Sequence, residues 1–206
     1  MMTRQTIRRC VALVAAIFFG TLCLSAAGEG DNRKVRIIQT NSAGDNVHVI
    51  DPATNKVVGI IDGIEVNHGV GGSPDGTRIY ISDEAESTLD VVDAKTLKVM
   101  KKVKLSGHPN NVAVGKDGKR VYVAIIQDPG GVDVVDTATL TRVKTIRTKG
   151  SIHNPYVTPD GKYVVAGSIV GKTVNVIDAK TEEPVWDVDM GLGVRPMTFA
   201  TNPDGS

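Results

Sequence analysis

One short motif occurs four times in the chain at nearly constant spacing, and this repeat limits the possible folds more than any other feature. Each copy ends a Val-rich run with an Asp and places a Thr three residues later. The four aspartates are Asp51, Asp93, Asp136 and Asp178, and they are separated by 42, 43 and 42 residues. A fixed period of about 20–50 residues is typical of solenoids, propellers and other repeat architectures.

A second marker, an Asp-Gly turn sequence, keeps the same period. Its aspartates are Asp75, Asp117, Asp160 and Asp204, spaced by 42, 43 and 44 residues. Glycine accepts the positive φ of a tight turn, so each Asp-Gly pair is expected to close a hairpin. In the Asp-x-x-Thr motif we expect the carboxylate to accept backbone N–H groups of another turn, which is a structural role and not a catalytic one.

The residues between these markers predict four short strands in each unit. In the unit around Asp117 the expected strands are 111–115, 120–125, 132–136 and 142–147, which are rich in Val, Ile and Tyr. These residue types suit a pleated, partly buried surface. Four antiparallel strands in about 43 residues match a propeller blade, so the sequence predicts an all-β propeller of four-stranded antiparallel blades.

Two segments carry a resemblance to a known family. Residues 73–81 (Ser-Pro-Asp-Gly-Thr-Arg-Ile-Tyr-Ile) and 116–124 (Lys-Asp-Gly-Lys-Arg-Val-Tyr-Val-Ala) are each followed by Val-Val-Asp-x-x-Thr. This pattern resembles the YVTN-type β-propeller repeat family, within the WD40/YVTN-like propellers, over about residues 33–206. The resemblance implies an exported propeller, commonly of seven blades, in a family whose members are mostly binding or surface proteins.

The repeats predict about four blades. The expected blades are 33–61 with three strands, then 68–104, 108–147 and 153–189, and finally a first strand within 195–206. One interpretation is a closed four-bladed ring in which the last strand joins the first three. The favoured interpretation is an N-terminal fragment of a longer propeller, part of a seven-bladed ring, because the final residues fall inside a turn motif.

Residues 1–27 have the layout of a secretory signal peptide. Arg4, Arg8 and Arg9 precede an apolar run, and Ser25-Ala26-Ala27 provides a small-residue cleavage site. This predicts a periplasmic or secreted protein whose domain is residues 28–206. An uncleaved anchor is an alternative, since a spanning helix needs about 20 apolar residues, and a twin-arginine signal is a weaker one. Both cysteines lie in the leader, so the mature chain would contain no disulfide.

The near balance of basic and acidic residues argues against a nucleic-acid-binding function. Lys and Arg total 24 and Asp and Glu total 23, which gives no electrostatic case for binding nucleic acid. The lysine-rich residues 99–105 are interpreted as a protected outer strand edge and not as a partner surface. Residues 83–86 (Asp-Glu-Ala-Glu) are interpreted as solvated loop charges.

Candidate ligand contacts come from the segments before each first strand, which we expect at one mouth of the propeller channel. Seven residues before each turn aspartate stand His68, Asn110, His153 and Met197. With their neighbours they give the candidate ligand-binding residues His68, His108, Asn110, Asn111, His153, Asn154 and Arg195. They are interpreted either as a polar ring for a small anion, a metal or a peptide end, or as groups that stabilise the loops. Spacing fixes no complete metal site and no catalytic triad, so no catalytic residue, metal or cofactor is assigned.

These observations predict an exported, non-enzymatic propeller that serves as a ligand-binding, protein-binding or scaffold module. The alternative is a propeller enzyme or enzyme subunit, of the lactonase, amine dehydrogenase or haem d1 type, with its site at the central channel. The expected partner is a small ligand or another protein. Neither nucleic acid nor a membrane span after leader cleavage is expected.

Overall fold

The computed structural model describes residues 34–200 and 202, and the predicted signal peptide lies outside these residues. Blade 1 contains β1 (Ile37–Thr40), β2 (Asn46–Asp51) and β3 (Lys56–Asp62). Blade 2 contains β4 (Asn67–Gly72), β5 (Arg78–Asp83), β6 (Thr88–Asp93) and β7 (Lys98–Lys104). Blade 3 contains β8 (Pro109–Val114), β9 (Arg120–Ile125), β10 (Gly131–Asp136) and β11 (Thr141–Ile146). Blade 4 contains β12 (Asn154–Val157), β13 (Tyr163–Gly167), β14 (Thr173–Asp178) and β15 (Glu183–Asp189).

Each blade is an antiparallel meander whose strands pair in chain order, three strands in blade 1 and four in each of the others. The all-β propeller prediction is therefore confirmed. The sequence predicted a first strand of a further blade within 195–206; of the described residues there, 195–200 contain no strand. A strand needs a neighbour for its backbone groups, and no described strand pairs with this segment. No helix in the described part of the chain is long and apolar enough to cross a bilayer.

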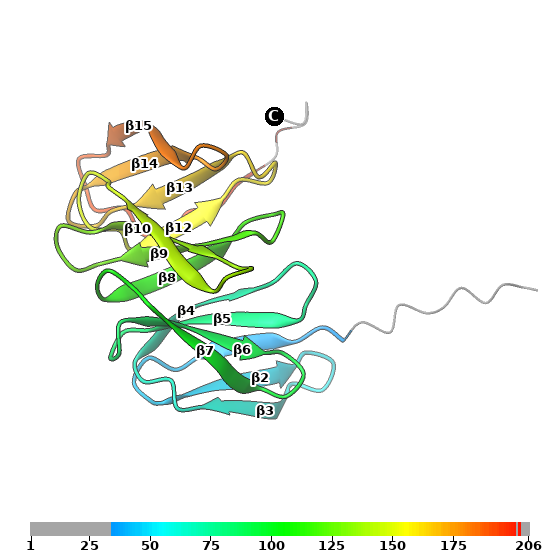
Figure 1. Ribbon diagram of the computed structural model, residues 1–206. Helices are drawn as coiled ribbons and strands as arrows, with labels where there is room; N and C mark the ends of the chain where they lie inside the picture. The colour runs from blue at the N-terminus through cyan, green and yellow to red at the C-terminus, as the bar shows by residue number, and fades with distance from the viewer. Residues whose placement is uncertain (1–33, 201, 203–206) are drawn as a thin grey trace, which may run out of the picture. The chain divides into compact units, whose positions relative to one another are not determined.

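The blades follow one another in chain order, and their first strands lie next to one another (Figure 1). β1 contacts β4, β4 contacts β8, and β8 contacts β12. At position 69 the approach is so close that a Cβ atom would lie 2.6 Å from the Asn111 Cα and 2.7 Å from the Asn110 carbonyl oxygen. Only glycine fits there, so the adjacent first strands of blades 2 and 3 require Gly69.

Three hydrophobic clusters fill the spaces between successive blades. The alternation of β9 shows how one strand serves two of them. Val121, Val123 and Ile125 pack with blade 2, while Tyr122 and Ala124 pack with blade 4. Because side chains alternate across a strand, a strand buried on both faces is a nearly continuous apolar run.

Both turn markers act as predicted. Asp136 accepts the backbone N–H groups of Ala138 and Thr139 at 3.0 and 2.8 Å and the Thr139 hydroxyl at 3.0 Å. These bonds, led by the Thr139 N–H, lower the pKa of Asp136. In the Asp-Gly turns, Gly118 adopts a φ of 71°. The structural interpretation of the repeated aspartates is confirmed.

An arginine that begins the second strand ties each middle blade to its neighbour. Arg78 Nη1 donates to the Thr137 carbonyl oxygen at 2.6 Å. Arg120 Nε donates to Glu182 Oε1 at 2.7 Å, and its Nη1 donates to Asp136 Oδ2 at 2.5 Å. Both arginines thus bond a turn of the next blade, which couples the blades at the Asp-Gly end.

We expect Arg120→Met to lower the free energy of unfolding by about 1–2 kcal/mol, because it removes charged hydrogen bonds in a partly exposed position. Urea unfolding followed by circular dichroism measures this. Lys119→Met is the matched control, since Lys119 is 78% exposed and its loss should have little effect. Equal destabilisation by the two variants would contradict a role for Arg120 in joining blades.

Candidate functional site

Residues from three blades converge on one cavity of about 280 Å³. It lies where the first strands begin and the second strands end, at the opposite end of the blades from the Asp-Gly turns. Its lining residues are His68, Glu84, Asn110, Ile126, Ser151, His153, Ile169 and Val170. Polar groups stand beside aliphatic walls, which is the usual composition of a small-ligand pocket.

Glu84 is the one acidic residue that lines this cavity, and the lining contains no Lys or Arg. Its Oε2 lies 2.7 Å from His68 Nε2 and its Oε1 lies 3.9 Å from His108 Nδ1, and its side chain is only 25% exposed. When the His68 imidazole is neutral it donates one N–H, and the Glu84 carboxylate keeps its negative charge. The cluster can therefore attract a cationic or donor-rich ligand group.

Side-chain amides bond both the ring and the backbone of His153. His153 Nδ1 bonds Asn154 Oδ1. An amide oxygen only accepts, so the ring donates from Nδ1, and the neutral form of this tautomer has its lone pair on Nε2. Asn111 Nδ2 donates to Asn110 Oδ1 at 2.8 Å and lies 3.3 Å from the His153 carbonyl oxygen. The Asn154 bond orients the His153 ring, whose neutral form presents a hydrogen-bond acceptor at the cavity wall, and the Asn111 bond holds its backbone.

The first strands hold these groups in place. Ser82 Oγ accepts from the Gly69 N–H at 2.7 Å and donates to the Asn110 carbonyl oxygen at 2.5 Å. The Asn111 N–H donates to the His153 carbonyl oxygen at 3.3 Å. Bonds of this kind link blade 2 to blade 3 and blade 3 to blade 4 directly at the cavity.

The structure brings some of the predicted residues together and not others. His68, Asn110 and His153 line the cavity. Asn111 and Asn154 lie outside the lining and form hydrogen bonds with Asn110 and His153. The His108 side chain is half exposed, and its Nδ1 lies 3.9 Å from Glu84 Oε1. Arg195 is exposed and lies outside the lining set.

Sequence reasoning missed a second set of lining residues. Glu84, Ile126 and Ile169 stand nine residues after Asp75, Asp117 and Asp160, one in each blade. The same repeat that revealed the first set therefore also contained this one. It faces the first set because the end of a second strand pairs with the start of a first strand.

A buried acidic pair lies next to the cavity in blade 2. Asp83 and Asp90 have no exposed surface, so the interpretation of Asp83 as a solvated loop charge is wrong. Lys102 Nζ lies 3.5 Å from Asp83 Oδ2, 3.3 Å from Asp90 Oδ2 and 2.9 Å from Glu86 Oε2. Its ammonium compensates both carboxylates.

The pKa directions in this cluster follow from burial and pairing. Burial raises the pKa of Asp90, against the hydrogen bond from Thr88 and the charge of Lys102. Burial opposes the charge of Lys102, yet its bonds to Glu86 and Asp90 raise the pKa of its ammonium. A single ammonium group, that of Lys102, thus forms ion pairs with two fully buried carboxylates.

Two other observations delimit the site. Among the described residues, no group of three His, Cys, Asp or Glu side chains is arranged to hold a metal ion.

A wider groove of about 620 Å³ lies between blades 3 and 4 at the Asp-Gly end. Its lining includes Arg120, Asp178 and Glu182, whose polar groups already bond within turns or between blades. The cavity beside Glu84 is therefore the better candidate.

Comparison with known proteins supports the fold. The chain is 29% identical over 110 residues to the uncharacterized protein YncE of Salmonella typhi, and equally to that of Salmonella typhimurium. The match covers 53% of this chain and 29% of each relative. The structure is similar to Kuenenia stuttgartiensis hydrazine synthase, with a TM-score of 0.72 and 24% identity, over 86% of this chain and 56% of that one.

A family model describes more than half of the sequence. The model of the cytochrome D1 heme domain matches residues 31–159, which include blades 1 to 3 and the start of blade 4. The matched stretch contains His68, Glu84, Asn110 and His153 of the candidate site. By this match, the chain belongs to the cytochrome D1 heme domain family.

Proposed function

We propose that this chain is a non-enzymatic binding module of an exported β-propeller, and that it takes a small ligand at the cavity beside Glu84. The observation that supports this most is the convergence of His68, Asn110 and His153, one from each of three successive blades, on a single cavity. A site built at equivalent positions of successive blades lies near the axis they share. The YVTN-like repeat pattern agrees with a binding role.

The lining suggests the chemical class of the ligand. Glu84 offers a carboxylate, and the bond between His153 and Asn154 leaves an acceptor nitrogen at the wall. Ile126, Ile169 and Val170 supply apolar surface. A small amine fits best, because its ammonium can donate to the acceptors while its hydrocarbon part contacts the aliphatic wall.

The family name raises the question whether these residues hold a haem. A haem iron takes an axial ligand such as histidine, and His153 offers a ring nitrogen. However, the volume of about 280 Å³ lies below the roughly 300–1,000 Å³ typical of pockets for drug-sized molecules, and a haem is larger than most of these. The lining contains no Arg or Lys to pair with carboxylates of the macrocycle. The lining of this cavity does not fit a haem.

The chain spans 29% of the length of its curated relatives and 56% of the structural neighbour. We infer that these four blades are part of a larger ring, of seven blades as the repeat family implies, in a protein exported through its N-terminal leader. A small ligand or a partner protein then meets the ring at its channel mouth.

We expect n-butylammonium to raise the thermal midpoint of residues 28–206, while butyrate does not. A ligand that binds only the folded state stabilises it by about 1.4 kcal/mol at ten times its Kd. Glu84→Gln should abolish the shift, because it removes the charge that pairs with the ammonium. Differential scanning fluorimetry across a ligand series measures the effect.

Glu183→Gln is the matched control, since Glu183 pairs with Lys144 at 2.8 Å on the outer strand of blade 4. It should keep the full response to n-butylammonium. A response that survives Glu84→Gln, or an equal response to butyrate, would rule out the proposed amine site.

A further inference from the structure

We propose that the outer strands of blades 2 and 3 bind an anionic lipid membrane. Residues 98–104 and 141–149 carry eight basic residues and no acidic one. These are Lys98, Lys101, Lys102, Lys104, Arg142, Lys144, Arg147 and Lys149, here called the basic surface. The rest of the chain has more acidic than basic residues, so the positive charge is concentrated here.

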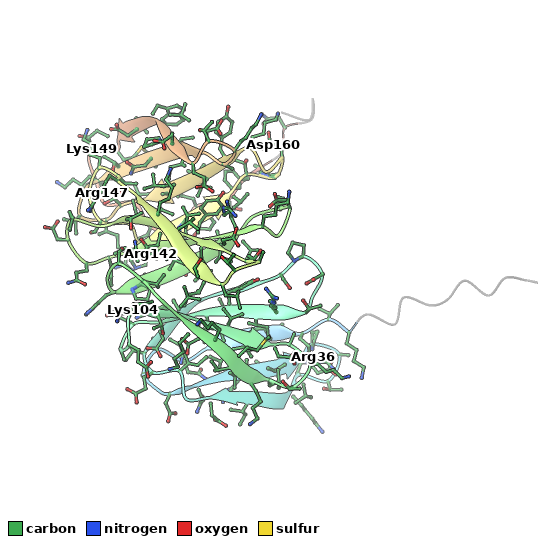
Figure 2. The ribbon with its side chains drawn as sticks, in the orientation of Figure 1. Arg36, Lys104, Arg142, Arg147, Lys149 and Asp160 are labelled. Carbon is green, nitrogen blue, oxygen red and sulfur yellow. The ribbon has the colours of Figure 1, made fainter. Side chains whose placement is uncertain are left out.

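The surface lies on free strand edges. β7 and β11 are the last strands of their sheets, and they contact each other. Figure 2 shows Lys104, Arg142, Arg147 and Lys149 along the same side of these blades. The charges are spread along β7, β11 and the three residues that follow β11, and are not gathered around one pocket. This suits an extended negative surface more than a compact anion.

Much of this charge is not neutralised within the protein. In the part of the chain that the structure describes, Lys98, Lys101, Lys104 and Arg147 form no ion pair with an acidic side chain; Lys104 donates to the Glu86 carbonyl oxygen at 2.8 Å. The other four are paired with acidic side chains: Lys102 with Asp83, Glu86 and Asp90, Arg142 with Asp133, Lys144 with Glu183, and Lys149 with Asp187.

The neighbouring side chains distinguish a membrane from a soluble acidic partner. Trp186 is 53% exposed and lines a cavity of about 200 Å³ together with Arg147 and Lys149. Met100 and Val143, on β7 and β11, are about half exposed. Tryptophan and basic residues beside exposed aliphatic groups match the headgroup region of a bilayer, where rings and aliphatic groups insert while ammonium groups meet lipid phosphates.

The test uses Trp186, because the sequence contains one tryptophan and its emission reports on this surface alone. Residues 28–206 keep all three buried clusters, which lie between Ile38 and Ala179, and omit the apolar leader. We expect phosphatidylglycerol-containing vesicles to sediment the protein and shift Trp186 emission to the blue. Pure phosphatidylcholine vesicles should do neither, and added salt should weaken binding because it screens exposed charges.

Charge reversal tests the residues. Since each Lys or Arg near an anionic surface contributes about 1 kcal/mol, Lys101→Glu with Arg147→Glu should weaken partitioning about tenfold or more. Lys95→Glu with Lys180→Glu, which reverses two exposed lysines in the Asp-x-x-Thr turns, has the same net charge and should bind within about twofold of the original chain. Equal loss in both variants, or no emission shift with phosphatidylglycerol, would overturn the proposal. Binding to polyglutamate without binding to vesicles would also overturn it, in favour of an acidic protein partner.

Discussion

Lys102→Met should lower the free energy of unfolding by about 2–4 kcal/mol. Removing one partner of a buried ion pair typically costs about 3–5 kcal/mol, because the remaining charge is left without compensation. Here Asp83 and Asp90 are fully buried, while the Lys102 side chain is 33% exposed, so water screens part of the loss. Equilibrium urea unfolding at neutral pH measures the change.

The deficit of Lys102→Met should depend on pH. An Asp whose pKa is raised in the folded state binds its proton more tightly there, so its ionisation costs stability as pH rises above the ordinary Asp value of about 3.9. Burial already raises the pKa of Asp90, and loss of the ammonium raises it further. We therefore expect the deficit to be smaller at about pH 5 than at about pH 8.

Two comparisons test the cause of that deficit. Lys101→Met changes the neighbouring exposed lysine, which forms no ion pair among the described residues, and should cost less than about 0.5 kcal/mol. Adding Asp90→Asn to Lys102→Met should recover part of the lost stability, because it removes one uncompensated charge. A Lys102→Met deficit that is independent of pH and unchanged by Asp90→Asn would show that Lys102 acts through packing alone.

Gly69→Ala should have an effect of similar size, through the contact between blades 2 and 3. Its Cβ would meet three backbone atoms of the neighbouring first strand, at Asn110, Asn111 and Val112, within 2.7 Å. Backbone atoms cannot rotate away as a side chain can, so the strands must separate. Overpacking of this kind costs about 1–3 kcal/mol or more, and we expect about 3 kcal/mol by urea unfolding.

The same substitution should weaken ligand binding at the cavity, since Gly69 and Asn110 are linked through Ser82. Gly72→Ala is the control in the same strand. A Cβ there meets no atom within 4 Å, so the variant should be as stable as the original chain or slightly more stable. If Gly69→Ala were as stable as Gly72→Ala, blades 2 and 3 could not meet as described.

The repeat made the blade architecture predictable from the sequence. Turn chemistry is local, so the hydrogen bonds of Asp136 to Ala138 and Thr139 follow from the residues beside it. Strand composition is also local, and the nearly continuous apolar run of β9 identifies a strand buried on both faces. His68, Asn110 and His153 could be found because each stands seven residues before a turn aspartate. Equivalent positions of successive blades lie at the same end of the propeller.

Cross-strand relations were harder to predict. The role of Lys102 depends on its position opposite Asp90 in the register of β6 and β7, which includes a bulge that the sequence does not mark. Residues 99–105 therefore looked like a uniform lysine-protected edge, although Lys102 compensates buried acids. Glu84 was missed for a similar reason, because its proximity to His68 depends on how the first two strands of the blade pair.

The most direct test of the fold and of the site together is the distance between the first strands of blades 2 and 3. In a nuclear Overhauser spectrum of assigned residues 28–206, we expect a strong cross-peak between the α protons of Gly69 and Asn111, since a Cβ on Gly69 would lie 2.6 Å from the Asn111 Cα. Absence of that cross-peak, with both resonances assigned and sharp, would mean that the two blades do not share an axis and that the cavity beside Glu84 does not form.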